Sequence, residues 1–371
     1  MMINRRLQWI LVFSISLIAI ISRLKFNGLV LNFDYGIYQP DGSHYAYRTL
    51  IFLGVESSVA AERVVDWYQA NGVKNNNFPP EFLTPENTTT WGLVAPRILY
   101  SLISIPFVYL FGISGMMVIP IMSFILLIFC IFRMSELLKR QSIGFLLILV
   151  LCSSPTVLRW MIANITDSLL AALFGVVILL LMSNVTNRKW NLGIVFLIVL
   201  TSMTRFCLPI WLAIAVVLWV NQTRWRSTTV LITSIIAFLP TYLYMPSNAV
   251  LPANSEADFI PKLFLLVRSF FAVGFIEVAQ LAALDRLLLV TLVVALVVAL
   301  KQKQEISSKY FLAVTLAAWI IGAINGTFGV NFRYQLPILG FASWVILANS
   351  TRFTDWFSGR GVDIVGKKTQ Y

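Results

Sequence analysis

Two aspartates in separate polar segments carry the chemistry that this sequence could perform. Asp41 lies in the polar run Tyr38–Ala46, and Asp167 ends a second short loop predicted over Arg159–Asp167. On the same side of a membrane, the two carboxylates could supply a general base, or together bind a divalent cation such as Mg2+ or Mn2+. Each could instead be a solvated loop residue, and Asp167 could, with Thr166, cap the helix that follows.

Other polar residues near these aspartates could bind an anionic ligand. His44, the one histidine of the chain, follows Asp41 by about one helical turn, and Tyr45 is next to it. Arginine binds phosphate through two parallel hydrogen bonds, so several arginines that converge would suit an anionic lipid headgroup, although each could also snorkel to the interface. The candidate arginines at predicted helix ends are Arg97, Arg159, Arg205 and Arg333, the last followed by Tyr334.

Two further observations limit the site chemistry. Asp34 precedes Asp41 in the same predicted loop and is the other candidate for the base. With one histidine, and with all three cysteines inside apolar segments, a zinc site of the histidine and cysteine kind is excluded.

Composition places these polar segments in an integral membrane protein. Hydrophobic residues make up 58% of the 371 and charged residues 12%, whereas a soluble domain has about a quarter of its residues charged. At about 20 apolar residues per span, we expect one all-α polytopic domain over residues 1–371 with about ten transmembrane helices. The net charge of +12 falls in short clusters between apolar runs, as in cytoplasmic loops, and does not indicate nucleic-acid binding.

The apolar runs define most of the spans. Trp190–Val220 is too long for one span and short for two, and Arg205 lies at its middle, so we expect two short helices joined at an extracytoplasmic turn. The other predicted spans are Leu7–Ser22, Met116–Phe132, Ile143–Leu158, Leu169–Ser183, Thr228–Tyr244, Leu287–Leu300, Tyr310–Ile324 and Leu336–Asn349.

Two apolar stretches, Ile98–Phe111 and Leu263–Leu284, could cross the bilayer or lie at its outer surface. If both stay at the outer surface, the basic clusters all face the cytoplasm, together with both termini. Residues 24–115 are then a first extracytoplasmic loop with interfacial helices, one of them amphipathic over Gly54–Gly72, and residues 350–371 are a short cytoplasmic tail. Arg268 and Glu277 are nine residues apart and do not share a helical face, so we assign them no role.

Five short motifs occur in an order that resembles the polytopic GT-C class of glycosyltransferases, in the branch of the aminoarabinose-lipid and protein O-mannosyl transferases. The resemblance extends over most of the chain, and this sequence departs from it in carrying Gly42 where a second acid is common. The motifs are Gln39-Pro40-Asp41 with Tyr45-Ala46, Pro96-Arg97-Ile98-Leu99-Tyr100 leading to Phe111-Gly112, Thr166-Asp167-Ser168-Leu169, Thr204-Arg205-Phe206, and Phe332-Arg333-Tyr334 with Pro337.

The resemblance implies transfer of a sugar from a polyprenyl-phosphate-linked donor to a lipid, glycan or protein acceptor on the extracytoplasmic face of a cell membrane. It implies Asp41 as the base, Asp167 as its partner for metal or acceptor, and Arg333 as the phosphate clamp. The alternative is a non-enzymatic lipid or polysaccharide transporter, which would place ionisable residues in the middle of the membrane, whereas most of those here lie at span ends.

The basic clusters predict that Gln141 and Ser307 face the cytoplasm and that Asp41 and Asn331 face the outside. Single cysteines at these positions, treated in intact cells with a membrane-impermeant maleimide, should react at 41 and 331 and stay unlabelled at 141 and 307. Labelling of position 141 from outside would overturn the topology.

Overall fold

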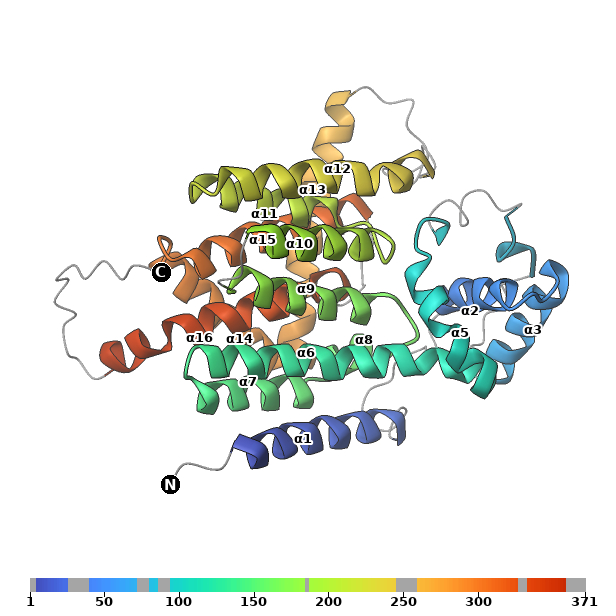
Figure 1. Cartoon of the computed structure of the whole chain (residues 1–371), viewed down its shortest axis with the longest axis horizontal. Helices are drawn as coiled ribbons and strands as arrows, with labels where there is room; N and C mark the ends of the chain where they lie inside the picture. Colours follow the sequence, from blue (N-terminus) through green and yellow to red (C-terminus); the bar gives the residue numbers. More distant parts are fainter. Residues whose placement is uncertain are drawn as a thin grey trace.

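The computed structural model describes residues 5–25, 40–71, 80–85, 94–183, 187–244, 259–325 and 332–357, and within these ranges it contains helices and no strand (Figure 1). The predicted all-α class is therefore confirmed for the described chain. Asp34 and Asn331 lie outside the described residues, as do residues 26–39 and most of the predicted tail. The helices are α1(Arg5–Lys25), α2(Pro40–Phe52), α3(Ser57–Ala70), η1(Pro80–Phe82), α5(Leu99–Phe111), η2(Gly112–Met117), α6(Val118–Leu137), α7(Gln141–Ser153), α8(Pro155–Met161), α9(Asp167–Leu181), α10(Asn187–Ser202), α11(Leu208–Val220), α12(Arg224–Tyr244), α13(Phe259–Leu284), α14(Arg286–Lys301), α15(Ile306–Asn325), η3(Arg333–Gln335) and α16(Ile338–Phe357).

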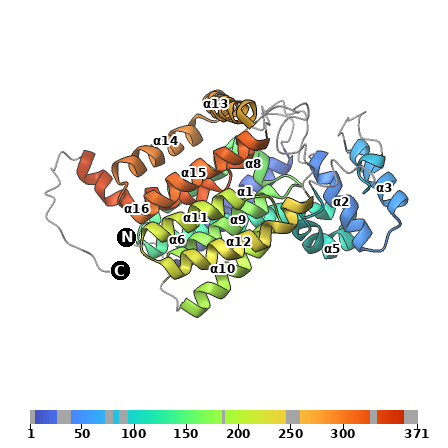
Figure 2. The same cartoon turned by 90° about the horizontal axis from the view of Figure 1, so that it is seen from above.

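A bundle of roughly parallel and antiparallel helices forms the body of the protein (Figures 1 and 2). The helix α9 packs against α6, α10 and α16, and α11 packs against α12 and α15. Because α9 is apolar around its whole circumference, burial on all sides gives it the largest hydrophobic stabilisation. All but one of the residues from Asp167 to Ile178 are buried. The start of this central helix is therefore fixed by the whole bundle.

A smaller group of helices, α2, α3 and α5, lies beyond one end of the bundle (Figure 1). The run Leu99–Leu137, which joins α5, η2 and α6, has 39 residues, which at 1.5 Å per residue is much longer than the roughly 30 Å of a bilayer core. The chain changes direction at η2, where a Cβ on Gly115 would meet the Phe107 carbonyl oxygen at 2.2 Å. The helix α5 therefore projects past the bundle (Figure 1).

Four described helices are long and apolar enough to cross a membrane, and a fifth is counted if one bent pair forms a single span. This fits a membrane-embedded all-α protein. Three further apolar helices, α9, α11 and the first part of α16, are shorter. The predicted total of about ten spans is not confirmed.

The chain from Trp190 to Val220 folds as two helices, α10 and α11, joined by the turn that carries Arg205, as we expect. The predicted span Ile143–Leu158 is broken within its length, because the chain bends by 74° between α7 and α8. Pro155 explains the break: a residue before proline avoids the helical region, and Ser154 has an extended ψ of 115°.

Asp285 stabilises this bend from a distant part of the chain. Its carboxylate accepts hydrogen bonds from the Ser154 hydroxyl and from the Thr156 backbone N–H, the latter at 3.1 Å. It also accepts from the Leu288 backbone N–H at 3.2 Å. One buried carboxylate thus caps the first turns of both α8 and α14, where backbone N–H groups have no partner within the helix.

The helix α13 runs across the direction of the bundle helices. Figure 1 shows it crossing them, and Figure 2 shows it nearly end-on. The segment Val267–Leu284 is long and apolar enough to span a membrane, but its orientation differs from that of the bundle. This geometry suits the predicted surface position of Leu263–Leu284. The helix packs on α15 and α14, and it touches α8.

The basic helix ends gather at the end of the bundle opposite α2 and α3. The N-terminal end of α1 meets the C-terminal end of α6 through an ion pair of Arg5 with Glu136 at 2.6 Å. At the same end Arg226 contacts Asn187 at 3.1 Å, and Lys309 contacts Asn221 at 2.9 Å. The pattern that predicts the cytoplasmic side is therefore a single surface of the folded chain.

The role of Asp285 as a double cap predicts a loss of stability in Asp285→Ala. That variant leaves buried donors at the starts of α8 and α14 unpaired, which costs about 1–3 kcal/mol. Asp285→Asn keeps an acceptor oxygen and should therefore lose less stability than Asp285→Ala. Thermal unfolding of the detergent-solubilised protein measures the effect, with the exposed Asp66→Ala on α3 as the control. Equal melting temperatures for Asp285→Ala and Asp66→Ala would contradict the capping role.

Candidate active site

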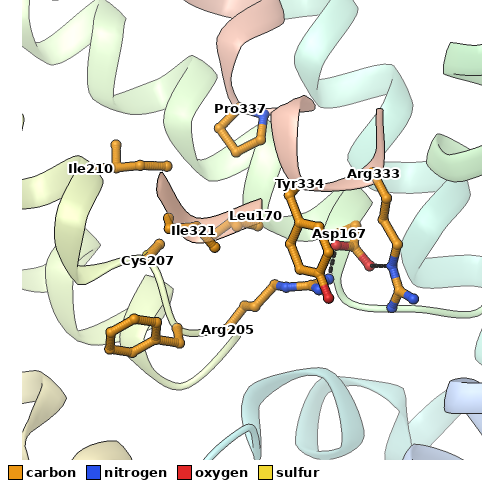
Figure 3. Close-up of a pocket in the computed structure, with 10 residues that line it drawn as sticks. Asp167, Leu170, Arg205, Cys207, Ile210, Ile321, Arg333, Tyr334 and Pro337 are labelled. Atoms are coloured by element: carbon orange, nitrogen blue, oxygen red, sulfur yellow. Dashed lines mark hydrogen bonds and ion pairs between the residues drawn. The ribbon is translucent and has the colours of Figure 1, made fainter. Parts of the chain in front are cut away.

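The predicted site residues come from four elements that meet at the end of the bundle facing α2. Asp41 lies in the first turn of α2, and Asp167 begins α9. Arg205 lies in the turn between α10 and α11, and Arg333 and Tyr334 lie in η3, just before α16. Figure 3 shows Asp167, Arg205, Arg333 and Tyr334 turned toward one another.

Arg333 joins the two aspartates. Its Nη2 lies 2.7 Å from Asp41 Oδ2, and its Nε donates to Asp167 Oδ2 at 2.9 Å. The side chains of Arg333 and Asp167 are 10% and 2% exposed, whereas that of Asp41 is 54% exposed. Asp41 is therefore the carboxylate at the open rim of the site, and Asp167 is the one at its base.

Arg205 completes the pairing of Asp167. Its Nη1 donates to Asp167 Oδ1, the second carboxylate oxygen, and its guanidinium lies 4.2 Å from the centre of the Tyr334 ring. Both oxygens of a buried carboxylate are thus held by arginines. The alternative of Asp167 as part of a helix cap loses its basis, because Thr166 makes no side-chain capping bond and the Asp167 carboxylate is used by the arginines.

Close packing between α2 and the segment before α9 fixes the position of Asp41. A Cβ on Gly42 would lie 2.3 Å from the Asn164 side-chain Nδ2 and 2.5 Å from the Asn164 backbone carbonyl oxygen. The Asn164 amide donates in turn to the Tyr68 hydroxyl on α3. Glycine at position 42 therefore lets the start of α2 approach the start of α9, and this approach brings Asp41 within reach of Arg333.

The ion pairs set the charge states at the rim. The Arg333 guanidinium lowers the pKa of Asp41 to about 2 and outweighs the effect of partial burial, which would raise it. Burial lowers the pKa of His44 to about 4, although the Asp41 carboxylate opposes that shift. Near neutral pH the Asp41 carboxyl is therefore ionised and the His44 imidazole is neutral.

Cations outnumber carboxylates in the described site. Arg97 is close enough to act electrostatically on His44, Arg205 and Tyr334. Three guanidiniums, of Arg97, Arg205 and Arg333, thus face two carboxylates. The Arg97 Nε is buried and has no hydrogen-bond partner among the described residues. The surplus charge favours an anionic ligand.

The remaining predicted residues surround this centre. The guanidinium of Arg159 lies 4.6 Å from the centre of the Trp160 ring, and that of Arg333 lies 5.5 Å from the same ring. Tyr45 is 1% exposed, and its ring meets Tyr100 edge-on at 5.4 Å. Its phenol group acts electrostatically on Arg205 and Arg333, but its burial between α2 and α5 suits packing better than contact with a ligand.

A pocket opens beside the ion pairs (Figure 3). It is narrow, with room for about one water molecule as its side chains stand, so a larger ligand requires them to move. Its polar wall consists of Asp167, Arg205, Arg333 and Tyr334, and its apolar wall includes Ile210, Ile321 and Pro337. A charged wall facing an apolar wall suits a ligand that has an anionic head and an apolar chain.

The described residues do not fit a resident divalent cation between the two aspartates. Both Asp167 oxygens are paired with arginines, and the Arg333 guanidinium occupies the position between Asp41 and Asp167. The described ranges also contain no group of three or more histidine, cysteine, aspartate or glutamate residues arranged for a metal ion.

Two residues of the site, Trp160 and Asn164, were not among the predicted site residues. Trp160 provides a ring for two arginines, and Asn164 links α2, α3 and the start of α9. Asn164 lies in the polar segment before Asp167, so its position along the chain was a usable signal. For Trp160 there was none, because a tryptophan near a helix end is common in membrane proteins.

Comparison with protein-family models, with curated proteins and with solved structures finds no match for the chain. The function is therefore argued from the geometry of the site.

The fit of Gly42 against Asn164 predicts that Gly42→Ala destabilises the protein. Overpacking of this kind costs about 1–3 kcal/mol, since Asn164 or the start of α2 has to move. Gly274→Ala is the matched control, because a Cβ there meets no atom within 4 Å and alanine favours the helix. Melting temperatures in detergent should fall for Gly42→Ala and stay level or rise for Gly274→Ala. A Gly42→Ala melting temperature equal to that of wild type would contradict the close approach.

Proposed function

We propose that the protein is a membrane glycosyltransferase that moves a sugar from a polyprenyl-phosphate-linked donor to an acceptor hydroxyl, with a role in glycan biosynthesis. The observation that carries this proposal is the ion-pair network in which Arg333 joins Asp41 and Asp167. A base candidate, a buried anion and a cation surplus meet there beside an apolar wall. The order of the five sequence motifs supports the same activity.

Asp41 is suited to the role of general base. Its carboxylate is ionised, lies at the rim of the site and is about half exposed, so an acceptor can reach it. In the proposed reaction Asp41 takes the proton of the acceptor hydroxyl while the oxygen attacks the anomeric carbon. The bond from that carbon to the phosphate oxygen breaks, and the lipid phosphate leaves with the bonding electrons, which inverts the configuration.

The arginines are suited to stabilise the departing phosphate. Two nitrogens of Arg333, Nε and Nη2, are used by the aspartates, which leaves Nη1 to face a ligand. When a phosphate binds, Arg333 can also exchange its contact with Asp41 for one with phosphate. That exchange would remove the cation that holds the Asp41 pKa down and so make Asp41 a stronger base.

Asp167 is suited to hold the arginines, because both its oxygens are engaged and its side chain is 2% exposed. Removal of one member of a buried charge network costs about 3–5 kcal/mol. In this proposal Asp167 is a positioning residue, and a metal or acceptor contact is not assigned to it.

The proposal places the site on the extracytoplasmic side of a cell membrane. The basic helix ends lie at the opposite end of the bundle, at Arg5, Arg226 and Lys309, and basic residues collect on the cytoplasmic side. A polyprenyl chain could then lie in the bilayer while its phosphate reaches the arginines.

A non-enzymatic lipid or polysaccharide transporter is the second candidate. One observation favours it: Glu277 is a buried ionisable residue within the apolar segment Val267–Leu284, as is common along transport pathways. The two functions differ in one product, because an enzyme releases lipid phosphate from the sugar-linked donor and a transporter does not.

Asp41→Asn should abolish transfer and leave the protein folded. The substitution keeps the volume of the side chain and removes the proton acceptor, so the rate should fall by at least about a hundredfold. The assay follows release of polyprenyl phosphate from a sugar-linked donor by the protein in nanodiscs, with the exposed Asp66→Asn as the matched control. Activity of Asp41→Asn within a few fold of wild type would remove Asp41 from the mechanism.

Arg333→Lys should lower transfer by at least about tenfold, even though it keeps the charge. Lysine cannot reproduce the fork that reaches Asp41 and Asp167 together, and charge-assisted hydrogen bonds are worth about 1.5–3 kcal/mol each, where about 1.4 kcal/mol is one decade. Arg63→Lys, at an exposed site on α3, is the control. Full activity of Arg333→Lys would overturn the clamp, and absence of lipid-phosphate release by wild type would favour the transporter.

A further inference from the structure

Behind the turn that carries Arg333 and Tyr334 lies a buried carboxyl group that the reaction does not use. It belongs to Glu277, on the helix α13 that crosses the bundle. Glu277 is 6% exposed, and its carboxyl lies near enough to the Phe332 backbone and the Gln335 side chain to interact with both electrostatically. A Cβ on Gly322 of α15 would meet Gln335 Nε2 at 3.3 Å and a methyl group of Val273, one helical turn before Glu277, at 3.4 Å, so this face of α13 lies against Gln335. Phe332 and Gln335 lie on either side of Arg333 and Tyr334.

The backbone of this turn needs support. Phe332 adopts a left-handed conformation with φ of 68°, which is rare for a bulky residue and persists only where surrounding contacts enforce it. Among the described residues, a backbone hydrogen bond from the Gln335 N–H to the Phe332 carbonyl, at 3.2 Å, closes the turn. A carboxyl close to the Phe332 backbone therefore bears directly on where Arg333 points.

The polar groups behind the turn are costly to bury. Gln335 is fully buried. Among the described residues, both of its side-chain amide atoms and Glu277 Oε2 have no hydrogen-bond partner. A Cβ on Gly322 of α15 would lie 3.3 Å from Gln335 Nε2, so the amide is tightly enclosed. Burying a polar pair of this kind lowers the stability of the fold relative to an apolar pair at the same place. The cost points to a role for the carboxyl other than packing.

We propose that Glu277 is a positioning residue that fixes the turn 332–335 and thereby aims Arg333 at Asp41 and Asp167. The effect of Glu277 on the turn is independent of the proposed function, and its effect on sugar transfer rests on that function. The helix α13 packs on α15 and is otherwise mostly unburied along Val267–Leu284. Its inward carboxyl therefore gives this outer helix a direct contact with the site.

The substrate-free test is hydrogen–deuterium exchange of the peptide that covers Phe332–Leu336, in wild type and three variants. Glu277→Ala removes the acceptor and should speed exchange of this peptide by at least tenfold. Glu277→Gln keeps an acceptor oxygen and should stay within about threefold of wild type. Val273→Ala removes a buried apolar contact of α13 with α15 and should leave the peptide unchanged. If Glu277→Ala fails to fold, Glu277→Met, of similar length, replaces it.

The second test is a double-mutant cycle in the transfer assay. If Glu277 acts through Arg333, Glu277→Ala should lower kcat/KM by about tenfold in wild type and by less than about twofold in an Arg333→Lys background. Equal losses in both backgrounds, or unchanged exchange in Glu277→Ala, would overturn the positioning role. Faster exchange in Glu277→Ala together with no transfer by wild type would support the role of Glu277 and contradict the proposed function.

Discussion

The rest of the structure depends on how one buried carboxylate is paired. Asp167 begins a central, largely buried helix of an apolar bundle, where an isolated charge would cost several kcal/mol. Arg205 and Arg333 each take one of its oxygens. These arginines come from the turn between α10 and α11 and from η3 before α16, so the pairing requires four helices to end at the same level. That requirement creates the site.

The same constraint explains why the site is polarised. Because Asp167 uses the inner donors of both arginines, the outer donors and the partly exposed Asp41 are what a ligand meets first. The Arg333 guanidinium keeps the Asp41 carboxyl ionised, and in the proposed reaction Asp41 is released when Arg333 turns to the phosphate. A phosphate that competes with Asp41 for Arg333 would thus couple ligand binding to activation of the base, with no group added to those that the chain supplies.

Much of the helical arrangement could be predicted from the apolar runs, and the hairpin of α10 and α11 followed from the cost of placing Arg205 inside the membrane. The break between α7 and α8 was missed although Pro155, inside the predicted span, is a local signal for it. The contacts of Asp285 that stabilise the bend could not be predicted, because Asp285 lies far away in sequence. The convergence of Asp41, Asp167 and Arg333 was predicted from their common position at helix ends. Their pairing was not, because the register of α2 against α9 depends on Gly42 and Asn164, whose contact exists only in the folded chain. Glu277 received no role because its spacing from Arg268 gives no shared helical face, and nothing in the sequence places α13 behind residues 332–335.

The central claim is that an anionic lipid headgroup binds where Arg333 meets Asp41. A cryo-EM structure of the protein in nanodiscs with a bound polyprenyl phosphate tests it most directly. We expect a phosphate within hydrogen-bond distance of Arg333 and Arg205, the lipid chain along Ile210, Ile321 and Pro337, and an Asp41 carboxylate separated from Arg333. A phosphate bound elsewhere on the bundle, with the ion pair of Asp41 and Arg333 intact, would contradict it.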